Sequence, residues 1–141
     1  MTTNNYNYTK LGFVGSTMGM SLQQHAHLLD YLETLHNCIA NQIELHICNC
    51  VGAEYEMYHI GKTFGYYIIT HSFVEPLKYR TEYLGNEILS LVSNRYVAQC
   101  NIINCCDNLI AIPNFDGFNV GDTWKSIMYA NSIDKFIKII Q

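Results

Sequence analysis

Leu11-Gly12-Phe13-Val14-Gly15-Ser16-Thr17-Met18-Gly19 joins a short apolar run to a glycine-bearing turn and then to a helix-like pattern. Two later stretches repeat this arrangement: Ile47-Cys48-Asn49-Cys50-Val51-Gly52-Ala53-Glu54, and Leu109-Ile110-Ala111-Ile112-Pro113 with Gly121-Asp122-Thr123-Trp124 beyond it. Short apolar runs that alternate with helical stripes are typical of repeated βα units. In an open parallel sheet such turns gather at the carboxyl edge, where helix N-termini offer free N–H groups to an anion. The sequence therefore predicts an α/β domain with a site for a small phosphate-bearing ligand.

The same patterns locate the expected elements. Five parallel strands are predicted, near residues 11–15, 44–48, 66–71, 108–112 and 136–140. Helices are predicted at residues 22–37, 53–64, within 86–105 and at 122–131. Their ends are marked by a capping box of Ser21 and Gln24, by Gly65 as a left-handed C-cap and by Asp122 as an N-cap. The stretch 72–85 contains Pro76 and breaks the periodicity, so we expect a longer loop there that serves as a lid over the ligand edge.

Length and composition bound the class of protein. The 141 residues fit one domain, expected over residues 10–141, with residues 1–9 as a frayed polar tail. The net charge of -4, with scattered Lys and Arg, argues against a nucleic-acid partner, and the lack of a long apolar run argues against a membrane segment.

The low charged fraction of 14% fits a buried subunit interface, so we expect a homodimer. Six cysteines without a Cys-x-x-Cys pair indicate a reducing, cytoplasmic setting, no metal site and no cofactor beyond the ligand.

Candidate phosphate contacts lie at the glycine turns. In the turn at Gly15, Ser16 and Thr17 place hydroxyls beside free N–H groups, as a phosphate site requires. An equally good interpretation is a turn that only needs the backbone freedom of glycine. Arg95 falls on an apolar stripe with Leu91, so its guanidinium is predicted to face inward. A ligand anion would satisfy it, and so would an ion pair, for which the candidate partners are Glu54, Glu87 and Asp116.

The other candidates have two interpretations each. Glu54 either stabilises the start of its helix through the dipole, or it accepts from ribose hydroxyls or acts as an acid or base. Gly121 and Thr123 open the last helix at the ligand edge, and Trp124 beside them either stacks on a base or belongs to the core. The histidines do not cluster in the sequence pattern, which favours structural roles for them.

Five motifs in this order resemble those of the SLOG superfamily, the DprA-like and LOG-like Rossmann-type nucleotide-binding proteins. They are Phe13-Val14-Gly15-Ser16, Asn49-Cys50-Val51-Gly52-Ala53-Glu54, Asn94-Arg95, Cys106-Asp107-Asn108-Leu109-Ile110-Ala111-Ile112-Pro113, and Gly121-Asp122-Thr123-Trp124. The resemblance implies a Rossmann-like three-layer domain with five strands in an order like 3-2-1-4-5, which places the turns after strands one and four side by side.

The resemblance also bears on activity. In LOG-type phosphoribohydrolases an Arg precedes the fourth strand, and Arg95 matches it, while a Pro-Gly-Gly-x-Gly-Thr-x-x-Glu motif follows that strand. Here Asn114-Phe115 follows Pro113, and Ser126 stands where the motif has its Glu.

A binder of a nucleotide or nucleotide-derived ligand, acting as a sensor or a sequestering protein, is therefore the first hypothesis. The expected phosphate contacts are Gly15, Ser16, Thr17, Gly52, Arg95, Gly121 and Thr123, with Glu54 near the sugar and Trp124 near the base. The alternative is an N-glycosidic enzyme, a nucleoside monophosphate phosphoribohydrolase or a deoxyribosyltransferase, with Glu54 as its catalytic carboxylate. A scaffold that keeps the fold without the site is the third hypothesis.

Overall fold

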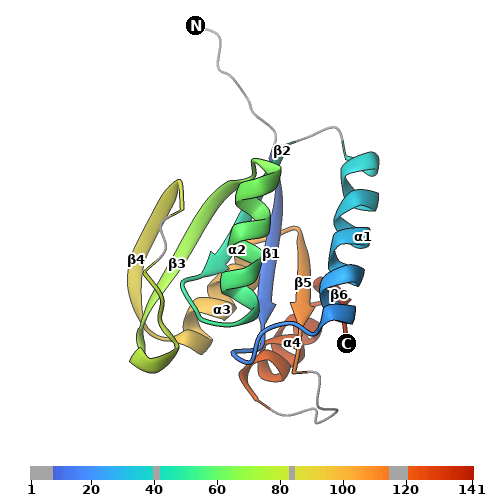
Figure 1. Cartoon of the computed structure of the whole chain (residues 1–141). Helices are drawn as coiled ribbons and strands as arrows, with labels where there is room; N and C mark the ends of the chain where they lie inside the picture. The colour runs from blue at the N-terminus through green and yellow to red at the C-terminus, as the bar shows by residue number, and fades with distance from the viewer. Residues whose placement is uncertain (1–7, 40–41, 83–84, 115–120) are drawn as a thin grey trace, which may run out of the picture.

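A six-stranded parallel sheet with helices on both faces forms the described part of the chain (Figure 1). The computed structural model describes residues 8–39, 42–82, 85–114 and 121–141. The strand order is β4-β3-β2-β1-β5-β6, and every pairing is parallel. The strands are β1 (Tyr8–Gly15), β2 (Gln42–Cys48), β3 (Tyr67–Glu75), β4 (Glu87–Asn94), β5 (Asn108–Ile112) and β6 (Phe136–Ile139). The helices are α1 (Leu22–Cys38), α2 (Ala53–Phe64), α3 (Arg95–Cys105), α4 (Asp122–Ser132) and the 3-10 helix η1 (Leu77–Tyr79).

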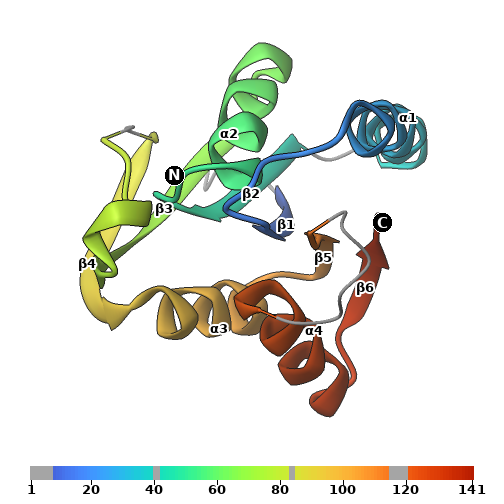
Figure 2. The same ribbon diagram turned by 60° about the horizontal axis from the view of Figure 1, so that its bottom comes forward.

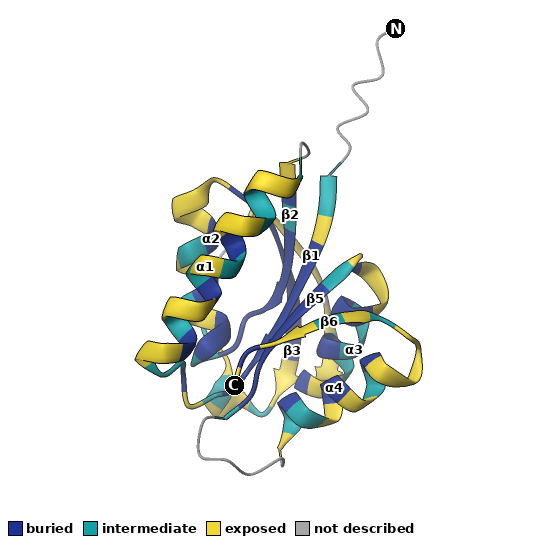
Figure 3. Cartoon of the chain, turned by 90° about the vertical axis from the view of Figure 1, so that its right-hand side faces the viewer, coloured by how far each residue is buried: buried dark blue, intermediate teal, exposed yellow. Residues whose placement is uncertain are grey.

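The first strand lies in the middle of the sheet. Leu11 of β1 pairs with Leu45 of β2 on one side and with Asn108 of β5 on the other. Phe13 and Val14 have no exposed surface, and Figure 3 shows β1, β2 and β5 buried over most of their length. A strand covered on both faces reads as a continuous apolar run, which is why Leu11 to Val14 carries no polar alternation.

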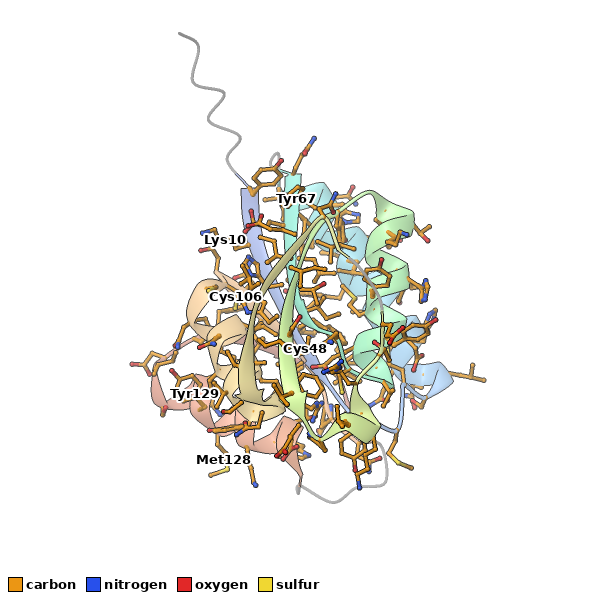
Figure 4. All side chains as sticks on the ribbon, turned by 90° about the vertical axis from the view of Figure 1, so that its left-hand side faces the viewer. Lys10, Cys48, Tyr67, Cys106, Met128 and Tyr129 are labelled. Carbon is orange, nitrogen blue, oxygen red and sulfur yellow. The ribbon has the colours of Figure 1, made fainter. Side chains whose placement is uncertain are left out.

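Two helical layers enclose the sheet (Figure 2). On one face, Leu28 and Leu32 of α1 and Met57 of α2 belong to one core cluster. On the other face, Ile102 of α3 and Ile127 of α4 belong to a second cluster. Figure 4 shows that Cys48 lies inside the molecule, whereas Met128 points outward from α4. The three-layer α/β class predicted from the sequence is confirmed.

The start of α1 and the end of α2 have the capping residues that the sequence predicts. The Ser21 side chain accepts from the Gln24 N–H while the Gln24 side chain accepts from the Ser21 N–H, so the predicted capping box is present. α2 ends at Gly65, whose φ of 76° and ψ of 25° are left-handed.

The expected number of strands was wrong, because residues 87–94 form β4 instead of the first half of a helix. Ile88 and Leu91 are three residues apart and Arg95 follows four later, a spacing that imitates a helical stripe. In the structure Ile88 is 49% exposed and Leu91 is 60% exposed, since β4 forms one edge of the sheet. The five expected strands keep their expected order, and β4 is added outside β3.

The expected loop at residues 72–85 is only partly a loop. Residues 72–75 continue β3, and η1 follows at residues 77–79. The segment is tied down by the N–H of Val51, which donates to the Tyr79 carbonyl at 2.7 Å, and by the N–H of Thr81, which donates to the Asn49 carbonyl at 2.9 Å. These bonds hold residues 79–81 against the turn after β2, while residues 83 and 84 of the expected lid lie outside the described residues.

Among the described helices, none combines the length and the apolar character that crossing a bilayer requires.

Candidate functional site

A cleft of about 290 Å³ lies where β1 and β5 end and α4 begins. Figure 1 shows the arrowheads of both strands at the lower end of the sheet, next to α4. Because β1 and β5 are neighbours, the turns that follow them are brought side by side. The described residues that line the cleft are Ser16, Thr17, Met18, Tyr79, Arg95, Asn114, Gly121, Asp122 and Thr123.

The turn after β1 is held by backbone hydrogen bonds. The N–H of Ser16 donates to the Ile112 carbonyl at 2.9 Å, which extends the pairing of β1 with β5 by one residue. The Ser16 Oγ accepts from the Met18 N–H at 3.0 Å, and the N–H of Gly19 donates to the Ser16 carbonyl at 3.2 Å. These bonds hold the turn so that Ser16 and Thr17 line the cleft.

Gly52 packs against the backbone of this turn and does not line the cleft. A Cβ on Gly52 would lie 2.4 Å from the Ser16 carbonyl oxygen and 2.5 Å from the Thr17 carbonyl carbon. The N–H of Ala53 donates to the same Ser16 oxygen at 2.8 Å. Gly15 is likewise a packing glycine, since a Cβ there would lie 2.6 Å from the Ala53 Cβ.

Arg95 is the first residue of α3 and is 3% exposed. Its Nη2 donates to the Gly15 carbonyl at 2.6 Å and lies 3.5 Å from Glu54 Oε2, and its Nη1 lies 3.4 Å from Asp122 Oδ2. Its Nε is buried without a hydrogen-bond partner among the described residues. The N-cap of α3 is Asn94, whose side chain accepts from the Val97 N–H at 2.9 Å.

Glu54 is completely buried and joins three helices. Its Oε1 accepts from Gln99 Nε2 of α3 at 3.3 Å, and the Gln99 Oε1 accepts from the Ser126 hydroxyl of α4 at 2.6 Å. Burial raises the pKa of Glu54 above its usual range, while the Arg95 guanidinium opposes this by lowering the pKa. Glu54 therefore belongs to the support beneath the cleft and does not line it.

The raised pKa gives a pH dependence that can be measured. In the folded state Glu54 binds a proton at a higher pH than in the unfolded chain. Its contribution to stability is therefore fully present below the unfolded-state pKa of 4.5 and is lost as the pH rises through the folded-state pKa. We expect the unfolding free energy of the wild type, minus that of Glu54→Gln, to fall as the pH rises from about 4.5, with a slope of at most about 1.4 kcal/mol per pH unit. Urea unfolding of both proteins across this range tests it, and a constant or rising difference contradicts it.

The N-terminus of α4 is the helix end that opens onto the cleft. α1 and α3 have side-chain caps, whereas the described residues provide no side-chain cap hydrogen bond at Gly121, the N-cap of α4. The expected cap, Asp122, is instead the first helical residue, and its carboxylate turns to Arg95 because the guanidinium is within reach. Thr123, 5% exposed, follows it and lines the cleft. The first N–H groups of α4 are therefore available to an anion.

The cleft gathers part of the predicted set of residues. Ser16, Thr17, Arg95, Gly121 and Thr123 line it. The other predicted residues, Gly15, Gly52, Glu54 and Trp124, do not line it, and Trp124 packs against the second core cluster instead. Of the partners considered for Arg95, Glu54 is the one found, and Asp116 lies outside the described residues.

Sequence reasoning missed Met18, Tyr79 and Asn114 as lining residues and assigned Asp122 only to a cap. Met18 and Asn114 follow directly on the turn and strand that were singled out, so their positions in the sequence contained a signal. Tyr79 had none, because its place depends on the long-range hydrogen bond from Val51.

The buried histidines lie elsewhere. His46 Nδ1 is 2.9 Å from His71 Nε2, and His46 Nε2 is 2.7 Å from Glu44 Oε1. Burial, followed by the neighbouring His46, lowers the pKa of His71 to about 4. Within the part of the chain that the structure describes, no group of three or more His, Cys, Asp or Glu side chains is arranged to hold a metal ion.

Comparison with protein-family models, with curated proteins and with solved structures finds no match to this chain.

Proposed function

We propose that this protein binds a nucleotide or a nucleotide-derived small ligand, with the ligand's phosphate in the cleft beside α4. The observation that carries the proposal is the pairing of a buried guanidinium, Arg95, with an uncapped helix N-terminus in one cleft. Helix N-termini and arginine are the two protein features best suited to phosphate oxygens. The resemblance of the five motifs to the SLOG superfamily supports the same ligand class.

The hydroxyls supply the remaining contacts in this proposal. Ser16 and Thr17 approach from the turn after β1, and Thr123 approaches from α4, so phosphate oxygens meet donors from both sides. The cleft volume of about 290 Å³ is at the small end of ligand pockets and fits a phosphate with part of a sugar. Trp124 packs against the second core cluster, so this proposal gives it no contact with the base.

The alternative of an N-glycosidic enzyme needs a carboxylate at the ligand. Glu54 has no exposed surface and does not line the cleft, so the geometry gives this role no support. A binding or sensing role fits the site better. A homodimer in the reducing cytoplasm remains part of the proposal, and the absence of a disulfide among the cysteines of the described residues is compatible with such a compartment.

Thr123→Val tests the binding proposal directly. The variant keeps the shape of the buried side chain but removes the hydroxyl, so we expect nucleotide affinity to fall by about tenfold or more, as for the loss of a hydrogen bond to a charged group. Isothermal titration with a panel of nucleoside monophosphates, cyclic monophosphates and inorganic phosphate measures the effect.

Thr34→Val is the matched control, because Thr34 is exposed on α1 and lies outside the cleft. We expect it to bind as the wild type does. The proposal fails when no member of the panel gives a binding heat or a rise in melting temperature with the wild type. Chromatography of the same samples detects free base, and its accumulation would favour the enzyme instead.

A further inference from the structure

The described side chains that line the cleft carry one positive and one negative charge. Arg95 is the cation and Asp122 is the anion, and Ser16, Thr17, Met18, Tyr79, Asn114 and Thr123 are neutral. The Asp122 side chain is 39% exposed, so its carboxylate stands at the cleft beside the N-terminus of α4. An incoming phosphate therefore meets a fixed negative charge next to its best donors.

Arg95 is not free to balance a strongly charged ligand. Its Nη2 lies 3.5 Å from Glu54 Oε2 and its Nη1 lies 3.4 Å from Asp122 Oδ2, so two carboxylates already share this one cation. Lys125 lies 4.0 Å from the other Asp122 oxygen, but its side chain is 66% exposed and water screens its charge. The cleft therefore attracts phosphate mainly through N–H groups and hydroxyls, with little surplus positive charge.

We infer that the cleft selects a singly charged phosphodiester over a doubly charged phosphate monoester, and that Asp122 is the residue that sets this preference. The inference rests on the proposed function and narrows its ligand class. A diester carries one negative charge, which the N–H groups of the α4 N-terminus and the hydroxyls at the cleft can accommodate. A monoester carries nearly two charges at neutral pH, and the second one is repelled by Asp122.

Asp122→Asn separates the charge from the shape of this side chain. The probes are the 3′,5′-cyclic monophosphates and the 5′-monophosphates of the four common ribonucleosides, titrated by calorimetry at about pH 7.5. With the wild type we expect the cyclic diester of the preferred base to bind about tenfold more tightly than its monoester. In Asp122→Asn we expect monoester affinity to rise by about tenfold and diester affinity to change by less than about threefold.

A second readout uses the ligand's own titration. Lowering the pH from about 7.5 to about 5.5 converts most of a phosphate monoester to its singly charged form, because its second pKa is about 6. We expect this to tighten monoester binding to the wild type, to leave diester binding unchanged and to have a much smaller effect in Asp122→Asn. Asp30→Asn, a change of an exposed carboxylate on α1, is the control and should keep the wild-type preference.

The outcomes distinguish this inference from the proposed function. Nucleotide binding in which the wild type takes the monoester as tightly as the diester, or in which Asp122→Asn leaves the ratio unchanged, overturns the charge selection alone. When none of the eight probes binds the wild type or Asp122→Asn, the proposed function and the inference fall together.

Discussion

Arg95→Ala is expected to lower the free energy of unfolding by about 3–5 kcal/mol, which is the usual cost of leaving one member of a buried ion pair without its partner. The substitution strands the Glu54 carboxylate, which has no exposed surface and keeps the Gln99 amide, at 3.3 Å, and the Cys50 thiol as its side-chain donors. It also removes the donor to the Gly15 carbonyl, at the turn that forms the cleft. Urea unfolding at about pH 7.5 measures the loss.

Two further variants identify the cause of this loss. Arg95→Met combined with Glu54→Gln removes both charges, so we expect it to recover at least half of the lost stability. Lys125→Ala removes an exposed cation that also lies near Asp122, and we expect a change within about 0.5 kcal/mol. Equal effects of Arg95→Ala and Lys125→Ala would show that the buried pair does not hold the helices together.

Gly52→Ala is expected to destabilise the protein by about 3 kcal/mol or more and to abolish ligand binding. The residue has a φ of 86° and a ψ of -134°, a conformation that side chains strongly disfavour. Its added Cβ would meet backbone atoms of Ser16 and Thr17 at 2.4–2.5 Å, and backbone cannot rotate away as a side chain would. Relieving the contact would move the turn that carries the Ser16 and Thr17 hydroxyls.

Gly65→Ala is the matched control for this variant. Gly65 also has a positive φ, 76°, but within 4 Å of a Cβ there the described part of the chain has no neighbouring atom. It should therefore show only the conformational cost, about 1–2 kcal/mol, and should bind as the wild type does. Thermal unfolding and nucleotide titration of both variants compare the two costs, and similar losses at the two glycines would refute the role of close packing at Gly52.

The parts of the fold that were predicted correctly have strong local signals. The capping box at Ser21 and the left-handed Gly65 act within one helical turn, so the sequence around them suffices. β4 lacked such a signal, because Ile88 and Leu91 lie at helical spacing and an edge strand need not alternate. Only its pairing with β3, which joins residues far apart along the chain, decides its conformation.

The residues of the candidate site divide in the same way, into those with a signal in the sequence and those placed by long-range contacts. Ser16, Arg95 and Thr123 were predicted at the cleft because glycine turns and a resemblance in motif order placed them there. The burial of Glu54 was not predicted, since a carboxylate in a first helical turn is usually exposed and the dipole accounts for it. Its place depends on Gln99 and Arg95, two residues of another helix.

The central position of β1 has a consequence for how the protein is made. The strand is complete only when Asn108 has arrived beside Leu11, because β5 covers the edge that β2 leaves open. During synthesis on the ribosome the apolar Phe13 and Val14 therefore emerge well before Ile110 and Ala111, the β5 residues that pair with them. A nascent chain stalled before β5 is expected to depend on chaperones, and release of that fragment should yield aggregates instead of a smaller folded unit.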